Sequence, residues 1–125
     1  MPPASSGTWG NSSTTKSDND TRWTGTRPVT LKDANGNAVK NATVTFTVSY
    51  RTSSNGTWIT LSGSYTATTN NSGVASLTTP KFRMSSSNNS PPYATQIRFT
   101  ITSVAATGST WDGSNATSNS VSRPN

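Results

Sequence analysis

Tryptophan and tyrosine are the residues of this 125-residue chain whose side chains could recognise a ligand. Carbohydrate-binding surfaces stack sugar rings on the flat faces of these residues and hydrogen-bond the sugar hydroxyls with Asn, Asp, Gln or Arg. Trp58 has the opposite parity to Ile59 and Leu61, so it faces solvent if those two side chains lie in a core. Trp58 is therefore the first candidate for a carbohydrate contact.

Three other aromatic residues are candidates that have structural explanations as well. Trp9 lies in a Gly-Thr-Trp-Gly segment and could equally plug one end of the fold. Trp111 precedes an Asp-Gly turn, where packing into the core or a corner is favoured. Tyr93 follows two prolines in a polar loop and could be exposed or packed. The fourth tryptophan, Trp23, shares its parity with apolar neighbours and is expected in the core.

The chain contains no His, Cys or Glu, and this excludes most catalytic chemistry. There is no histidine base, no thiol nucleophile, no disulfide and no zinc site of the usual ligands. Paired carboxylates for glycoside hydrolysis are not expected, since every acid lies in or beside a turn: Asp18, Asp20, Asp33 and Asp112. The segment 33–37 resembles the start of a calcium loop but lacks the later Glu. The sequence predicts no enzyme, no metal site and no cofactor.

The elements that would position the aromatic residues are β-strands. Thr, Val and Ile suit a pleated surface, and good helix formers are scarce. Pro28 indicates an edge strand or an irregularity, because proline cannot donate to a strand ladder. Period-two alternation marks the segments 23–31, 42–50, 57–69, 74–78 and 97–102, with a last strand around 104–111 or 119–121. Asn- and Gly-containing turns separate these segments, which predicts an all-β sandwich of about seven antiparallel strands.

The length fits one domain, which we expect to span residues 8–123. Residues 1–7 have the Pro- and Ser-containing composition of an interdomain linker remnant. No stretch approaches the roughly 18 apolar residues that cross a bilayer, and the first residues lack the pattern of a signal peptide. Nearly half of the chain is Ser, Thr and Asn, and only 11% is charged. We therefore expect a fragment of a larger secreted bacterial protein with neighbouring domains and no membrane insertion.

The net charge of +6 makes a polyanion partner worth considering. The ten basic residues are spread along the chain, and Lys81 and Arg83 come nearest to a cluster. Neither belongs to a nucleic-acid-binding motif. The positive balance follows from the shortage of acids, and nucleic acid is not predicted as a partner.

Several segments resemble bacterial immunoglobulin-like domains. Residues 29–48 and 68–77 are similar to invasin- and intimin-type domains, with a Val-Thr-Leu strand, an Asp-x-x-Gly turn, an Ala-x-Val-x-Phe strand and a Thr-Asn-x-x-Gly-x-Ala segment. The Arg-Trp-Thr opening at 22–24 and the Phe-Thr-Ile-Thr-Ser-Val strand at 99–104 resemble immunoglobulin-like modules appended to secreted bacterial hydrolases. The resemblance implies an immunoglobulin-like fold over residues 22–104.

Two functions fit these observations. The first is a non-catalytic carbohydrate-binding accessory module of a secreted bacterial enzyme, which binds a plant or microbial cell-wall polysaccharide through exposed aromatic residues. The alternative is a structural spacer or adhesin-type domain without its own ligand. A spacer should bury its tryptophans, whereas a binding module should leave two or more of them coplanar and exposed.

Overall fold

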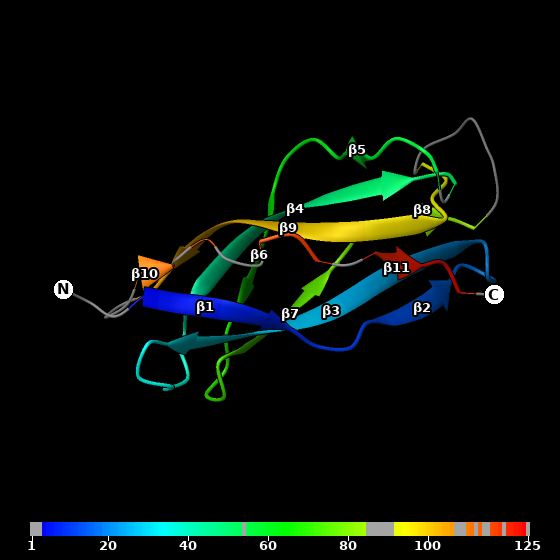
Figure 1. Ribbon diagram of the computed structural model, residues 1–125. Coiled ribbons are helices and arrows are strands. Elements are labelled where there is room, and N and C mark those ends of the chain that lie inside the picture. The colour runs from blue at the N-terminus through cyan, green and yellow to red at the C-terminus, as the bar shows by residue number, and fades with distance from the viewer. Residues whose placement is uncertain are drawn as a thin grey trace.

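The computed structural model covers residues 1–125 and describes residues 4–53, 55–84, 92–106, 110–111, 113, 116–118 and 120–124. Within these residues the chain forms eleven strands in two sheets that face each other (Figure 1). The first sheet holds β1 (Ala4–Trp9), β2 (Ser13–Ser17), β3 (Arg22–Asp33), β7 (Val74–Thr78), β8 (Phe82–Arg83) and β10 (Thr110–Trp111). The second holds β4 (Thr43–Arg51), β5 (Ile59–Thr60), β6 (Tyr65–Thr68), β9 (Gln96–Ala105) and β11 (Val121–Ser122). The predicted all-β sandwich is confirmed.

One long strand organises each sheet. In the first sheet, β3 pairs with β1 and β2 along one side and with β7 and β8 along the other. In the second sheet, β4 pairs with β9 along one side and with β5 and β6 along the other. The strand pairs of the described chain are antiparallel except for β1 with β10, which is parallel.

The number of strands exceeds the expected seven because four of those described have only two residues each: β5, β8, β10 and β11. These short strands extend the sheets beside longer neighbours. The expected single strand over 57–69 is divided into β5 and β6, and Gly63 lies between them at a φ of +84°.

The composition of residues 1–7 predicts a linker remnant, but the structure places residues 4–7 in a strand. They belong to β1, which pairs with β3 from Ser5 opposite Asp33 to Trp9 opposite Val29. Small polar residues form this strand because β3 supplies a paired backbone for them to join. The described part of the sandwich therefore includes residues 4–7, which lie outside the expected domain of residues 8–123.

Pro28 lies in the central strand β3, at a break in the pairing along one side. β2 pairs with β3 up to Thr26, and β1 begins to pair at Val29. The Pro28 carbonyl accepts a hydrogen bond from the Gly10 amide at 2.8 Å, so its nitrogen also points toward this break. The missing N–H therefore falls where no ladder bond is needed. Of the two predictions, the irregularity is confirmed and the edge strand is wrong.

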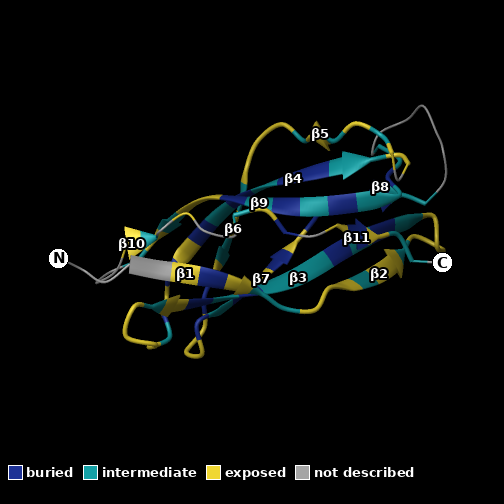
Figure 2. Ribbon diagram, viewed as in Figure 1, coloured by how far each residue is buried: buried dark blue, intermediate teal, exposed yellow. Residues whose placement is uncertain are grey.

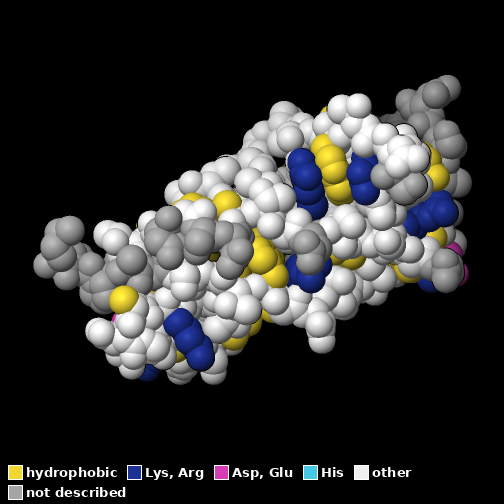
Figure 3. Space-filling view, in the orientation of Figure 1, with side chains coloured by type: hydrophobic (Ala, Val, Ile, Leu, Met, Phe, Trp, Pro, Cys, Tyr) yellow, Lys and Arg dark blue, Asp and Glu magenta, His cyan; other side chains and the backbone are white. Residues whose placement is uncertain are grey.

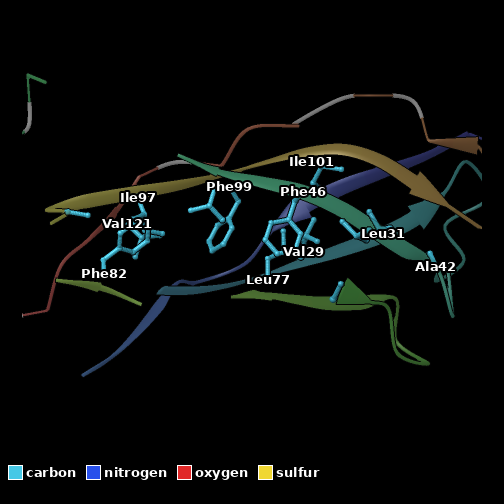
Figure 4. Close-up of a cluster of buried hydrophobic side chains, with 14 of the residues drawn as sticks. Val29, Leu31, Ala42, Phe46, Leu77, Phe82, Ile97, Phe99, Ile101 and Val121 are labelled. Atoms are coloured by element: carbon cyan, nitrogen blue, oxygen red, sulfur yellow. The ribbon is translucent and has the colours of Figure 1, made fainter. Parts of the chain in front are cut away.

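The core fills the space between the two sheets, where buried residues alternate along β3, β4 and β9 (Figure 2). Phe46 of β4 and Phe99 of β9 meet edge to face with ring centroids 5.7 Å apart (Figure 4). Trp23 is fully buried, as expected, and its indole N–H donates to the Ala94 carbonyl at 3.2 Å. Aromatic and β-branched side chains thus supply most of the buried apolar contacts in a chain that is only 28% hydrophobic.

Buried hydroxyl groups complete the backbone hydrogen bonding at the ends of strands. Thr69 Oγ1 accepts from the Ala42 amide at 2.8 Å and donates to the Val39 carbonyl at 2.7 Å. The hydroxyls of Thr79 and Ser118 each accept from a buried strand amide at 3.0 Å. Each hydroxyl satisfies a backbone group that would otherwise be buried without a partner.

Replacing Thr69 with valine should therefore destabilise the fold, although the two side chains have nearly the same shape. Thr69→Val leaves the Ala42 amide and the Val39 carbonyl without this partner, which should lower the free energy of unfolding by about 2 kcal/mol. Urea titration followed by tryptophan fluorescence measures the change. Thr68→Val, at the exposed neighbouring position, is the control and should shift stability by less than about 0.5 kcal/mol. Equal stability of the two variants would contradict this role for Thr69.

The turns that follow β3 and β6 share one hydrogen-bonding pattern. The side-chain oxygen of Asp33 accepts from the second and fourth amides that follow it, at 2.9 and 3.0 Å. The side-chain oxygen of Asn70 does the same at 2.9 and 3.1 Å. The third residue after each is a glycine at positive φ, Gly36 at +82° and Gly73 at +78°. The predicted turns are confirmed, and Asp33 serves the turn itself.

The two glycines should respond differently to alanine. Gly36 has open space where a Cβ would lie, whereas a Cβ on Gly73 would lie 2.6 Å from the Leu31 carbonyl oxygen. Gly36→Ala should cost about 1 kcal/mol for the left-handed conformation alone. Gly73→Ala should cost at least about 1 kcal/mol more, because the backbone of β3 must move. Chemical denaturation of both variants checks the order, and a larger loss in Gly36→Ala would contradict it.

Candidate functional site

After β4 the chain turns back beside it and forms β5 at the edge of the second sheet. β5 pairs Ile59 with Tyr50, and the same register continued by one residue puts Trp58 opposite Arg51. Residues opposite each other on antiparallel strands project from the same face. Tyr50 packs toward the core, so Arg51 and Trp58 project outward. Trp58 is half-buried on this outer face.

Two guanidinium groups flank the Trp58 ring. The Cζ atoms of Arg51 and Arg98 each lie 4.4 Å from the ring centroid. Figure 3 shows a hydrophobic group between two basic groups where β4, β5 and β9 come to the surface. Both faces of the indole are therefore covered by cations. We call these three residues the Arg–Trp–Arg cluster.

Polar neighbours fix the base of the cluster. Arg51 Nε donates to Gln96 Oε1 at 2.7 Å, and these two residues are paired across β4 and β9. Ser49 lies opposite Arg98 in the ladder and shares a 3.0 Å hydrogen bond with the hydroxyl of Thr60. These polar neighbours and both arginines belong to strands, whereas Trp58 directly precedes β5. The two guanidinium groups are therefore held on the rigid part of the fold.

The positive charge of the cluster has no carboxylate beside it in the described chain. The ion pair found among the described residues joins Lys81 to Asp18 at 3.1 Å, at another place on the surface. Arg98 Nε is buried and has no hydrogen-bond acceptor among the described residues. A cationic donor in this position is costly to leave unsatisfied. The cluster therefore favours a ligand that brings hydrogen-bond acceptors.

The structure places the other candidate aromatic residues in different surroundings. Trp9 is half-buried and stacks on Phe99 with centroids 6.4 Å apart. Trp111 is half-buried in β10, and its indole nitrogen is buried. The ring centroid of Tyr93 lies 5.8 Å from the Arg123 Cζ atom, and the Tyr93 backbone forms an isolated β-bridge with Arg83. These contacts do not bring the four candidates into one coplanar platform. Trp9, Trp58 and Trp111 are half-buried, so the described residues do not show the exposed, coplanar tryptophans expected of a stacking surface.

Trp58 faces outward as its parity predicts, but the expectation for Ile59 is wrong. Ile59 is 48% exposed although it has the parity of core residues. β5 is a two-residue strand at the edge of the sheet, so its inward face is not covered. Leu61 is half-buried and packs against the core.

Sequence reasoning missed Arg51 and Arg98 as partners of Trp58. Arg51 could have been found from the local hairpin, because alternation places it on the outer face beside Trp58. Arg98 comes from a distant strand, and its place follows only from the pairing of β9 with β4. No pattern near Trp58 indicates that pairing.

A depression lies on the outer face of the first sheet. It is lined by Ser6, Thr8, Trp9, Gly10, Thr30 and Lys32. It therefore brings the candidate residue Trp9 beside hydroxyl groups and one ammonium group. Neither this depression nor the rest of the described chain contains three His, Cys, Asp or Glu side chains grouped to hold a metal.

No protein-family model, curated protein or solved structure matches this chain. The resemblance to bacterial immunoglobulin-like domains therefore stays a prediction based on short motifs. Among the residues that the structure describes, none belongs to a helix with the length and hydropathy needed to cross a bilayer.

The position of Trp58 predicts a small effect of its removal on stability. Trp58→Ala should lower the free energy of unfolding by about 1 kcal/mol, because cation–π contacts at a half-buried surface position contribute little. Trp23→Ala should cost about 3–5 kcal/mol, because it empties a fully buried site. Guanidinium titration of both variants measures the difference. A Trp58→Ala loss as large as that of Trp23→Ala would assign Trp58 to the core.

Proposed function

We propose that this chain is a non-catalytic polysaccharide-binding module of a secreted bacterial protein, acting on a plant or microbial cell-wall glycan. The observation that carries the proposal is the Arg–Trp–Arg cluster: an outward indole with a guanidinium group on each side and no carboxylate beside them in the described chain. The neighbouring outward positions of β4 carry small hydroxyl residues instead, Thr47 and Ser49.

Binding at this surface uses N–H groups rather than an open aromatic face. A sugar ring could stack on Trp58 only by displacing Arg51 or Arg98. The guanidinium groups instead donate hydrogen bonds to sugar oxygens, and the indole between them limits their movement. Hydroxyl groups of Thr47 and Thr100, paired across β4 and β9, extend the polar surface along the strands.

The alternative is a structural spacer. The packing of Trp9 against Phe99 and the half-buried position of Trp111 favour it, because these tryptophans contribute to the fold. On this alternative the Arg–Trp–Arg cluster only braces the loop that carries β5.

A polysaccharide panel separates the two functions. Affinity electrophoresis on soluble glucans, xylans, mannans and pectins, with pull-down on insoluble cellulose, chitin and xylan, should show retention on at least one glycan. Trp58→Ala should weaken that retention roughly tenfold, because both guanidinium groups lose the ring that orients them.

Ile59→Ala is the matched control, since Ile59 is exposed on the same short strand but lies outside the cluster. Circular dichroism confirms that each variant is folded. Absence of retention on every glycan would overturn the proposed function in favour of the spacer. Equal weakening in both variants would remove Trp58 from the binding surface.

A further inference from the structure

We propose that the ligand of the Arg–Trp–Arg cluster is an anionic polysaccharide whose acidic groups are bound by Arg51 and Arg98. This inference rests on the proposed function and names the chemical class of its ligand. The acidic group is an oxyanion attached to a sugar ring. It is either the planar carboxylate of a uronic acid or a tetrahedral sulfate ester.

The first argument is the uncompensated charge. Two guanidinium groups each lie 4.4 Å from one ring centroid, so their Cζ atoms are no farther apart than twice that distance. Like charges at this separation repel each other at the ionic strength of most solutions. The indole quadrupole offsets part of the repulsion, and the described chain supplies no carboxylate to offset the rest. An anionic ligand would relieve it.

The second argument is the unused hydrogen-bonding capacity. A guanidinium group has five N–H donors, and among the described residues Arg51 donates its Nε–H to Gln96 and makes no other side-chain hydrogen bond. The Nε of Arg98 is buried and has no acceptor among the described residues. Carboxylate and sulfate oxygens are the acceptors that match the fork of an arginine side chain. Neutral sugar hydroxyls accept the same bonds more weakly.

The third argument is the local extent of the positive surface, which favours a glycan over a nucleic acid. Lys81 is paired with Asp18, and Arg123 donates to the Met84 carbonyl. Five other basic residues belong to strands of the first sheet rather than the sheet that carries the cluster: Lys16, Arg22, Arg27, Lys32 and Arg83. A nucleic acid backbone needs a run of cations to match its closely spaced phosphates. Two arginines beside hydroxyl-bearing strands fit a chain with an isolated acidic group on each sugar.

The test compares polysaccharides that differ in charge alone. Polygalacturonate and its fully methyl-esterified form share one backbone, and dextran sulfate and dextran form a second pair. Isothermal titration at physiological salt should show binding of polygalacturonate or dextran sulfate at least roughly tenfold tighter than of the uncharged member of that pair. The pair that shows the difference identifies carboxylate or sulfate as the bound group.

Variants assign the effect to the cluster. Arg51→Gln/Arg98→Gln should lose the preference for the charged polysaccharide. Lys32→Gln/Lys40→Gln removes the same amount of charge from exposed positions outside the cluster and should retain it. Arg51→Lys/Arg98→Lys keeps the charge but lacks the planar fork, and should lose most of the preference.

Four other results would overturn the anionic ligand, the role of the cluster, the choice of a glycan or the polysaccharide-binding function. Equal binding of charged and uncharged polysaccharides would overturn the anionic ligand while leaving the polysaccharide-binding function in place. If Lys32→Gln/Lys40→Gln lost as much of the preference for the charged polysaccharide as Arg51→Gln/Arg98→Gln, net charge rather than the cluster would attract the ligand. Tighter binding of a DNA oligonucleotide would replace the glycan by a nucleic acid. Binding of no polysaccharide would overturn the proposed function itself.

Discussion

The register of β4 against β9 is the constraint on which both faces of the second sheet depend. Inward, it brings Phe46 and Phe99 together in the core. Outward, it sets Arg51 and Arg98 on the face that Trp58 covers. Because side chains alternate with period two, a slip of one residue would expose the aromatic core and bury the arginines. The core therefore specifies the geometry of the candidate site, although the core side chains project from the opposite face of the sheet.

An irregularity in the same ladder shows how closely the two faces are linked. Thr102 is the extra residue of β9 where the register shifts between Thr45 and Phe46, and its hydroxyl donates to the Thr45 carbonyl at 3.2 Å. Before this bulge, odd-numbered residues such as Ile101 face the core. After it, Val104 packs against the core instead. The bulge keeps apolar residues inside over the full length of the strand, as extra residues in antiparallel pairs commonly do.

Alternation in the sequence was sufficient to predict the fold class, the outward position of Trp58 and the buried position of Trp23. It failed where tertiary pairing overrides local composition. Residues 4–7 have the composition of a linker but find a partner in β3, and Ile59 has core parity on a strand too short to be covered. The cluster was only partly predictable, because a pattern within one strand carries no information about the strand that will lie beside it.

The arrangement of the cluster also bears on how so polar a chain could recognise a ligand. An indole with an arginine on each face cannot stack on a sugar ring. It can instead separate the two guanidinium groups and orient them. Arg51 is held further by Gln96, so less conformational entropy remains to be lost on binding. Recognition at this surface would then depend on oriented charge rather than on apolar contact. In a chain with 11% charged residues, two oriented guanidinium groups are a more specific feature than four dispersed tryptophans.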